Sequence, residues 1–278
     1  LTRAVNRAKD ELDNPFAIRV LKALCLVKYI KEFKPTIRNI CILMQSNFDE
    51  DPLQLKKKVE EALSRLEQQT YIQRNGELYE YLTDEEKDVE EEIKKTEVEN
   101  SSVQEELQTI ISRIIKNKKI RYSNGHDYSF ASKLDDKLYG RDYELSINIA
   151  SPFNENIDNE AVLKAHNMGK NELLVVMEAD KRLVDDLLNY KRTDKYISQN
   201  GSSTQQDSIK RILSDKGHQN QTRHKNIELR VKELLSKTKL FINGNLQDIG
   251  GEDPQTRIEK AFTNLVEATY PYLGMIYG

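Results

Sequence analysis

Apolar residues recur every three or four positions through the first part of the chain, which is the spacing of one buried helix face. This pattern predicts a helix over 15–32, a short helix over 37–44 and a third helix that starts at Asp51-Pro52. An acid followed by proline favours a helix start, because the acid caps free N–H groups and proline has none to satisfy. The Asn75-Gly76 pair in YIQRNGELYEYL then predicts a hairpin with a type I′ turn. Three helices followed by a hairpin predict a winged helix over residues 1–82.

Residues 83–118 have the pattern of a connector. Thr83 and Glu86 form a capping box, in which each side chain bonds the other residue's backbone N–H. The segment Asp84–Glu99 carries nine acids and three lysines. Such a run is either an acidic surface for a basic partner or a solvated connector helix, and we favour the connector. Ser102 and Glu105 predict a second capping box, at the start of a strongly apolar helix.

From Lys119 onward the periodicity changes to that of strands alternating with helices. Residues 143–150 alternate polar and apolar positions, and 172–177 form a short apolar run typical of a central strand. Lys239–Ile242 is expected to be a strand before an Asn243-Gly244 turn, and Asp253-Pro254 to start a last helix. Residues 119–278 are therefore predicted to be a mixed α+β domain with a small sheet.

A long helical hairpin is predicted within this domain. Both ends of 203–239 have apolar stripes, but the middle, SDKGHQNQTRHKN, has no apolar residue. A helix that is polar all round is usually solvated or broken, and Gly217 is the expected kink. The segment carries nine Lys or Arg residues against four acids. A basic arm for nucleic acid and a solvated hairpin therefore both remain open. The predicted fold class is α+β: a winged helix, then a mixed domain with a small sheet and this hairpin.

The balance of basic and acidic residues indicates how well each segment could contact nucleic acid. The third helix of the winged helix has four basic residues against three acids, whereas a dedicated DNA reader shows a one-sided basic footprint. We therefore favour protein packing for the winged helix and expect any DNA binding to be weak and sensitive to salt. The candidate nucleic-acid contacts are seven basic residues: Arg223, Lys225, Lys210, Arg211, Lys56, Lys57 and Arg74.

Catalytic and metal motifs are missing from the sequence. A phosphate-binding loop needs G-x-x-x-x-G-K-S/T, but Gly169-Lys170 is followed by Asn171, and Lys164 stands where the first glycine belongs. The four histidines lack zinc-ligand spacing, so no metal and no catalytic residue are predicted. Asp135-Asp136 is expected to cap a turn or pair with nearby cations rather than bind a metal. Cys25 and Cys41 are expected to be buried, reduced thiols.

Several long blocks resemble the BrxC family, the P-loop proteins of the bacterial BREX phage-exclusion system. The blocks are FAIRVLKALCLVKYIKEFKPTIRNI (16–40), NGELYEYLTDEEKDVEEEI (75–93), KIRYSNGHDYSFASKLDDKLYGRDYELSINIASPF (119–153), LFINGN and PQTRIEKAFTNLVEATYPYL. The resemblance implies a large AAA+-like ATPase that uses ATP and magnesium, with a winged helix after its nucleotide-binding region. None of the ATPase motifs can be placed on a residue here. The start at Leu1 also fits an excised piece.

The resemblance leads to one hypothesis, a non-catalytic region of a BREX ATPase that serves assembly and weak DNA engagement. It implies other BREX proteins as partners, homo-oligomers through the parent ATPase and a cytoplasmic location. No cofactor is expected in this chain. The alternative is a winged-helix transcription regulator with a sensing domain. The net charge of −3 and 32% charged residues fit either, since they exclude only an overall pull toward nucleic acid.

Overall fold

Two compact units make up the chain, and we describe each separately. A computed structural model describes residues 2–202 and 206–271. Internal contacts assign Leu1–Glu97 and Arg192–Arg223 to an N-terminal unit, and Val98–Lys191 and His224–Gly278 to a C-terminal unit. Two long helices, α8 (Lys181–Asn200) and α9 (Asp207–Ser236), contribute residues to both. The domain boundaries predicted at residues 82 and 118 remain a prediction.

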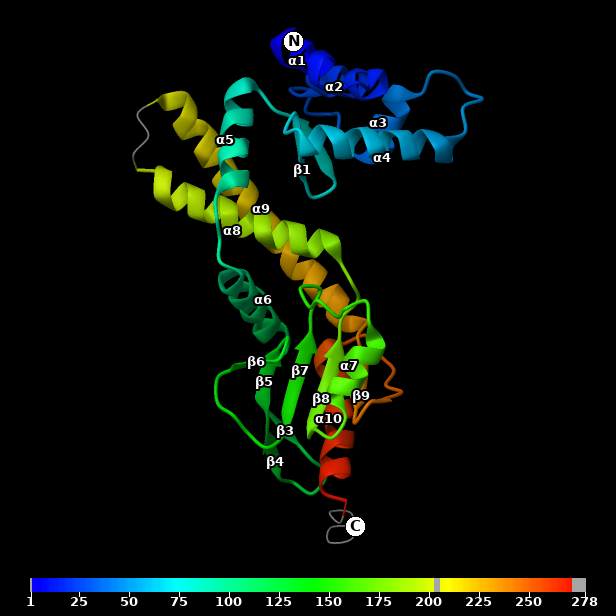
Figure 1. Cartoon of the computed structure of the whole chain (residues 1–278), viewed down its shortest axis with the longest axis vertical. Coiled ribbons are helices and arrows are strands. Elements are labelled where there is room, and N and C mark those ends of the chain that lie inside the picture. Colours follow the sequence, from blue (N-terminus) through cyan, green and yellow to red (C-terminus); the bar gives the residue numbers. More distant parts are fainter. Residues whose placement is uncertain (1, 203–205, 272–278) are drawn as a thin grey trace. The chain divides into compact units, whose positions relative to one another are not determined.

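Helices and one hairpin build the N-terminal unit (Figure 1). In chain order these are α1 (Thr2–Glu11), α2 (Pro15–Val27), α3 (Ile37–Met44), α4 (Pro52–Gln68), β1 (Ile72–Asn75), β2 (Leu78–Tyr81) and α5 (Asp84–Lys95). The predicted start of α4 is confirmed, because Asp51 accepts a hydrogen bond from the Leu53 N–H at 3.1 Å. Helix α1 was not predicted, and its Val5 and Ala8 are buried in the core of this unit.

Two predictions about these elements are wrong. Helix α2 ends at Val27 rather than near residue 32, since beyond it Tyr29 and Ile30 are exposed and have no core to cover. In the hairpin, Asn75 pairs with Leu78, so the turn residues are Gly76 and Glu77, and of these only Gly76 has a positive φ. A strand that slips by one residue turns all its side chains to the other face. The observed register keeps Ile72 beside Tyr81, both buried.

The acidic helix α5 is confirmed as a capped helix with a narrow buried stripe. Thr83 and Glu86 form the predicted capping box. Val89 and Ile93 pack against Leu213 of α9 in a small apolar cluster. The charged residues Lys87 and Glu90 are also buried, which a solvated connector does not require.

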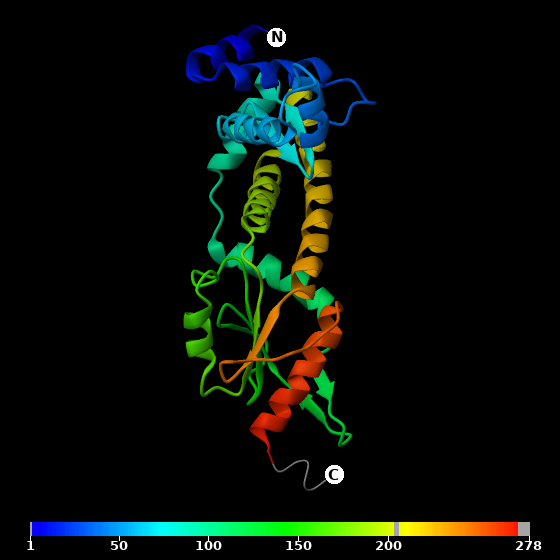
Figure 2. The same cartoon turned by 90° about the vertical axis from the view of Figure 1, so that its right-hand side faces the viewer.

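Helix α9 corrects the expectation of a kinked, solvated polar segment. It runs without interruption through Gly217 (Figure 2). Lys216 is only 3% exposed and Asn220 is also buried. The Lys216 amine lies 2.5 Å from a Glu90 carboxylate oxygen and also donates to the Gln73 side-chain oxygen. One face of the polar middle of α9, with Lys216 and Asn220, is therefore buried against matching polar partners, while most of its other residues are exposed.

One main sheet organises the C-terminal unit. Within the described residues six strands pair in the order β10-β9-β8-β7-β5-β6. They are β5 (Ala131–Leu134), β6 (Lys137–Tyr139), β7 (Ser146–Ala150), β8 (Glu172–Val176), β9 (Lys239–Ile242) and β10 (Asn245–Leu246). The central strands β5, β7 and β8 are parallel, whereas β6, β9 and β10 pair antiparallel. A separate hairpin joins β3 (Lys119–Arg121) to β4 (Asp127–Ser129). The mixed α+β class is thus confirmed.

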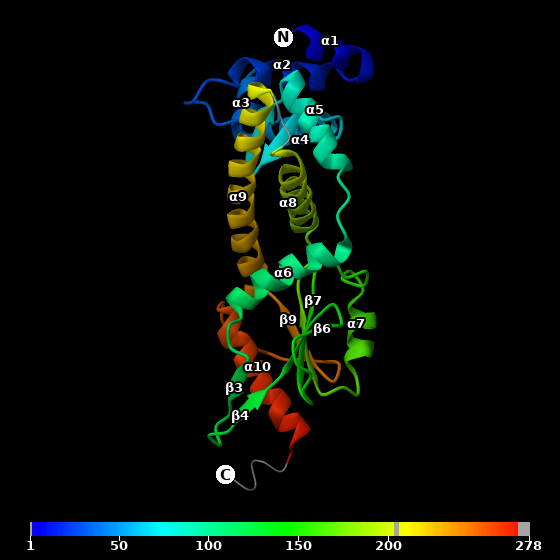
Figure 3. The same cartoon turned by 90° about the vertical axis from the view of Figure 1, so that its left-hand side faces the viewer.

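Helices cover both faces of this sheet (Figure 3). On one face lies α7 (Glu160–Asn167), whose Leu163 packs against Leu174 and Phe241. The other face packs against α6 (Asn100–Ile114), α10 (Pro254–Thr269) and the final turns of α9. The predicted Asp253 cap of α10 is confirmed by its bond from the Thr256 N–H at 2.9 Å.

The second predicted capping box is wrong. Helix α6 begins at Asn100, with Glu99 in the cap position and without a side-chain cap. The helix therefore starts three residues earlier than a box at Ser102 would place it. Val103, which is buried in the main core beside Leu107, lies inside the helix rather than at its first position.

Turn residues in the C-terminal unit follow the prediction more closely. Asn243 and Gly244 both have positive φ between β9 and β10, as a type I′ turn requires. Asp135 and Asp136 likewise both have positive φ in the two-residue turn between β5 and β6. The turn interpretation of this pair is therefore confirmed. None of the helices in the described part of the chain is long and apolar enough to cross a membrane.

Candidate functional site

The predicted nucleic-acid residues on α9 differ in their surroundings. Lys210, Arg211 and Lys225 are exposed. Arg223 is half-buried, and its guanidinium donates to the side-chain oxygens of Asn220 and Asn75, the latter at 3.4 Å. Arg223 thus links α9 to the β1–β2 hairpin. Its geometry fits a structural contact better than an open phosphate ligand.

The other predicted nucleic-acid residues, Lys56, Lys57 and Arg74 of the N-terminal unit, also differ in their surroundings. Lys56 and Lys57 are exposed on α4, and the Lys56 amine lies 3.9 Å from Glu60 on the next turn. Arg74 donates to the Gly76 carbonyl at 3.1 Å and so supports the hairpin turn. Of the seven candidates, the structure brings Arg74 and Arg223 to the same hairpin. Arg74 lies in β1 next to Asn75, and Arg223 donates to the Asn75 side chain.

Exposed apolar side chains gather in one stretch of the N-terminal unit, residues 26–53. Sequence reasoning missed this feature, although Phe48 in a polar loop was a visible signal. The loop between α3 and α4 that carries Phe48 stands away from the helices (Figure 1), and Phe48 is 100% exposed. The exposed large apolar residues of the stretch are Leu26, Tyr29, Ile30, Ile42, Leu43, Phe48 and Leu53.

Cys41 lies within this stretch and Cys25 directly before it. Both are half-buried and pack at the border of the N-terminal core, so the expectation of buried thiols is wrong. Burial raises the pKa of the Cys41 thiol, with the Glu60 carboxylate adding to the effect. A raised pKa keeps a thiol protonated and poorly nucleophilic.

A polar cluster occupies the carboxyl ends of the parallel strands in the C-terminal unit. Asp135, after β5, accepts hydrogen bonds from the Ser151 N–H at 2.8 Å, the Ser151 hydroxyl at 2.6 Å and the Asn154 amide at 2.9 Å. Asp136 exchanges bonds with the Asn148 side chain, at 2.7 and 3.2 Å. Burial raises the pKa of Asp135, and the bonds from Ser151 and Asn154 partly offset this rise.

These contacts give the cluster a structural role. They tie the β5–β6 turn to the loop after β7, and they engage both carboxylate oxygens of Asp135 and one of Asp136. Among residues 2–202 and 206–271, no group of three or more His, Cys, Asp or Glu side chains is placed to hold a metal ion. His224, one of the histidines considered for zinc, lies instead between the carboxylates of Glu106 and Glu228, at 2.6 and 3.1 Å.

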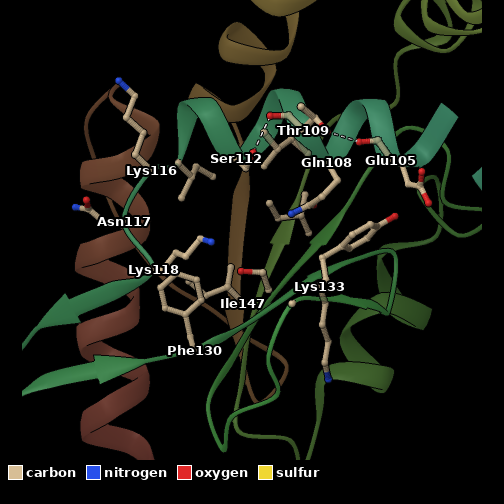
Figure 4. Close-up of a pocket in the computed structure, with 16 residues that line it drawn as sticks. Glu105, Gln108, Thr109, Ser112, Lys116, Asn117, Lys118, Phe130, Lys133 and Ile147 are labelled. Atoms are coloured by element: carbon tan, nitrogen blue, oxygen red, sulfur yellow. Dashed lines mark hydrogen bonds between the residues drawn. The ribbon is translucent and has the colours of Figure 1, made fainter. Parts of the chain in front are cut away.

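A cavity of about 430 Å³ lies between α6 and the β5–β6 edge of the sheet (Figure 4). Its floor is apolar and includes Phe130, Ile147 and Ile149, while Gln108 and Glu105 line it from α6. Lys118 extends into the cavity, whereas Lys116 and Lys133 point away from it. This cavity could not be predicted from the sequence, because strand β5 and its partner β6 were not predicted.

Comparison with known families agrees with this architecture. Residues 96–265, more than half of the chain, match the family model described as the BREX ATP-binding protein BrxC 4th domain with six-stranded beta sheet. The described residues of the C-terminal unit form a sheet of that size. No solved structure gives a significant match to the chain. The family match covers the sheet, α6, α7 and most of α10, and it agrees with the blocks that resembled this family, so the chain belongs to the BrxC family of BREX ATP-binding proteins.

Proposed function

We propose that this chain is a non-catalytic region of a BREX ATP-binding protein and that it docks onto other BREX proteins. The observation that carries the proposal is the set of exposed apolar side chains in residues 26–53, with Phe48 fully exposed. Water hydrates exposed apolar side chains unfavourably, so these residues gain free energy when a partner covers them. Family membership favours this function over that of a transcription regulator.

The order of elements in the N-terminal unit supports a winged helix within this proposal. Helices α2, α3 and α4 precede the β1–β2 hairpin, and the Tyr79 N–H of β2 donates to the Pro35 carbonyl at 2.9 Å. This bond ties the α2–α3 connection to the hairpin, as a short third strand does in winged helices. Helix α4 then takes the place of the recognition helix.

The exposed start of α4 favours a protein over DNA as its partner. Leu53, in the first turn, is 78% exposed, and Lys56 on the next turn already has Glu60 beside it. An exposed leucine gains free energy against another apolar surface but gains little against phosphates.

Binding of the purified chain to each purified BREX protein, by calorimetry, tests the docking proposal. Phe48→Ser and Leu53→Ser should each weaken binding about tenfold, because an apolar anchor at an interface is worth roughly 1–2 kcal/mol or more. Leu246→Ser is the matched control, since Leu246 is an exposed leucine on β10 in the other unit. Unchanged binding in both variants, or an equal loss in the control, would contradict docking through residues 26–53.

Weak DNA engagement is the second candidate function, supported by the exposed cations Lys210, Arg211 and Lys225 along α9. Titration with duplex DNA across salt concentrations should show little sequence preference. Replacing Lys225 by glutamate should lower the salt slope by about one unit, as loss of one phosphate contact does. Lys56→Glu is the comparison. If only Lys56→Glu weakens binding, the winged helix rather than α9 contacts DNA.

A further inference from the structure

A second pocket, also of about 430 Å³, lies on the C-terminal unit where α6 packs against α9 (Figure 3). Arg113 of α6 lies 3.2 Å from the Glu228 carboxylate of α9 and joins the two helices there. Ile110 and Ile114 line the pocket from α6, and Leu229 lines it from α9. Leu229 is 67% exposed, so the apolar lining of the pocket is open to solvent.

Cations flank this apolar lining. Lys225 precedes Leu229 by four residues and Lys232 follows it by three, so the three side chains share one face of α9. Both lysines line the pocket and are exposed, and neither forms an ion pair within residues 2–202 and 206–271. Glu228, the one acid among the residues that line the pocket, is already engaged by Arg113. The pocket is therefore complementary to an apolar side chain with acids beside it.

The chain itself carries a segment of that chemistry. The loop between α3 and α4, residues 45–51, reads QSNFDED, so three acids follow Phe48 directly and the loop has no basic residue. Phe48 is 100% exposed, and Asp49 beside it is exposed as well. The Glu50 carboxylate accepts hydrogen bonds from the Ser46 N–H and hydroxyl at 3.1 and 3.2 Å, which closes the loop on itself. A loop that is ordered before it binds loses less conformational freedom on docking.

We propose that the loop 45–51 of one copy of this chain docks into the α6–α9 pocket of a second copy. Phe48 covers the apolar lining of the pocket, and the Asp49 carboxylate lies beside the amines of Lys225 and Lys232. The contact joins two different surfaces, so each copy can bind one neighbour through its loop and another through its pocket. Head-to-tail contacts of this kind build chains or rings. The self-association uses Phe48 of the proposed docking stretch, but it does not depend on binding to another BREX protein.

Light scattering by the whole chain at increasing concentration tests the proposal. The contact is small, so we expect self-association with a Kd of about 0.1 mM that weakens with added salt, because opposite charges meet at its rim. Phe48→Ser should weaken self-association about tenfold, as loss of an apolar anchor does. The pocket variant, Leu229→Ser combined with Lys232→Glu, should weaken it at least as much. Lys181→Glu, a charge reversal at an exposed lysine on α8, is the control and should change nothing.

A mixture of the two variants identifies the two surfaces. Phe48→Ser has an altered loop and an intact pocket, whereas the pocket variant has an intact loop. Each should be monomeric alone at the Kd of the native chain. Their mixture should form pairs with the native Kd but nothing larger, because each pair retains a single native contact. The replaced side chains are all exposed, and circular dichroism with thermal melts establishes that each variant is folded.

Three outcomes would overturn the proposal. The first is a native chain that stays monomeric; if the pocket variant then also loses binding to duplex DNA, the pocket contacts DNA instead. The second is a folded pocket variant that associates as the native chain does. The third is a mixture of the two variants that stays monomeric while the native chain associates, since Phe48 would then contact another surface. None of these outcomes bears on docking to other BREX proteins, which the pocket variant should bind as tightly as the native chain does.

Discussion

Lys28 shows how single charged residues hold the N-terminal unit together. It follows α2, and its amine lies 3.2 Å from Glu80 on β2 and 3.0 Å from Glu86 on α5. It also donates to the Tyr81 carbonyl. Burial acts to lower the pKa of Lys28, but the two carboxylates outweigh it and the pKa is raised. Burial acts to raise the pKa of Glu86, but the nearby Lys28 amine outweighs this effect. The pKa of Glu86 is therefore lowered.

Glu86→Gln should therefore destabilise the chain in a pH-dependent way. A carboxyl with a lowered folded-state pKa stabilises the fold above its ordinary value of 4.5 and loses that contribution as pH falls through the folded value. At pH 7 we expect a loss of about 1–2 kcal/mol, because Lys28 keeps Glu80. The loss should shrink toward zero below pH 4.5. Urea unfolding at several pH values measures it.

Glutamine is the informative replacement because it keeps the capping box. Glu86 accepts from the Thr83 N–H at 3.2 Å, and a glutamine oxygen can do the same. Glu85→Gln, an exposed acid on the same turn, is the matched control and should cost less than about 0.5 kcal/mol. A Glu86→Gln loss that stays constant from pH 7 to pH 3 would contradict the ion-pair explanation.

At the scale of elements, α9 persists through a glycine and a polar stretch. Glycine in a helix interior costs roughly 0.5–1 kcal/mol relative to alanine, because its backbone loses more freedom on folding. A Cβ at Gly217 would meet only the Ile197 side chain, at 4.0 Å, which is an ordinary contact distance. The position therefore has room for a methyl group.

Gly217→Ala should stabilise the chain by about 0.5–1 kcal/mol, seen as a higher urea midpoint at unchanged slope. Gly244→Ala is the contrasting variant. Gly244 has φ +75°, and its Cβ would lie 2.9 Å from a Met168 side-chain atom, so alanine there should destabilise. A Gly217→Ala variant that unfolds earlier than the native chain would show that α9 needs the glycine.

Helix starts belong to this scale as well, and most follow from the sequence. Asp51, Thr83 and Asp253 each cap the helix that follows, since the bond spans two or three residues and needs no distant partner. The failed box at Ser102 shows the limit of such signals. There the helix starts three residues earlier, and its cap residue Glu99 makes no side-chain cap bond.

At the scale of the whole molecule, the sequence departs from what the family name says. The matched family is described as ATP-binding, yet the sequence has no phosphate-binding loop. Without backbone N–H groups to cradle phosphates and a hydroxyl for magnesium, phosphoryl transfer lacks its positioning groups. We therefore expect that this chain by itself does not hydrolyse ATP.

The purified chain should show no ATP hydrolysis above the buffer rate in a phosphate-release assay with magnesium. A full-length parent that contains a phosphate-binding loop is the positive control. Turnover by the chain that persists after repeated purification, and scales with its concentration, would contradict the expectation.

The sequence alone determined the local and periodic features of this protein. These features are the helical stripes, the caps at Asp51 and Asp253, and the Asn243-Gly244 turn. Each depends on residues within about four positions of each other, so a short segment of sequence is enough to predict it. The long blocks that resemble BrxC also predicted the family, which the family-model match over residues 96–265 confirms. The candidate cations could be identified from the sequence. The sequence did not show that Lys225 is exposed whereas hydrogen bonds hold Arg223 in place.

Only the tertiary structure decided what distant residues do to one another. Lys216 looks like part of a solvated polar run, yet it is buried because Glu90, 126 residues away, supplies a carboxylate. The same holds for the hairpin register and for the cavity, which depends on Ser132 lying beside Ile147 under α6. A buried charge or an unfilled space is set by partners far along the chain, and periodicity in a short window carries no information about them.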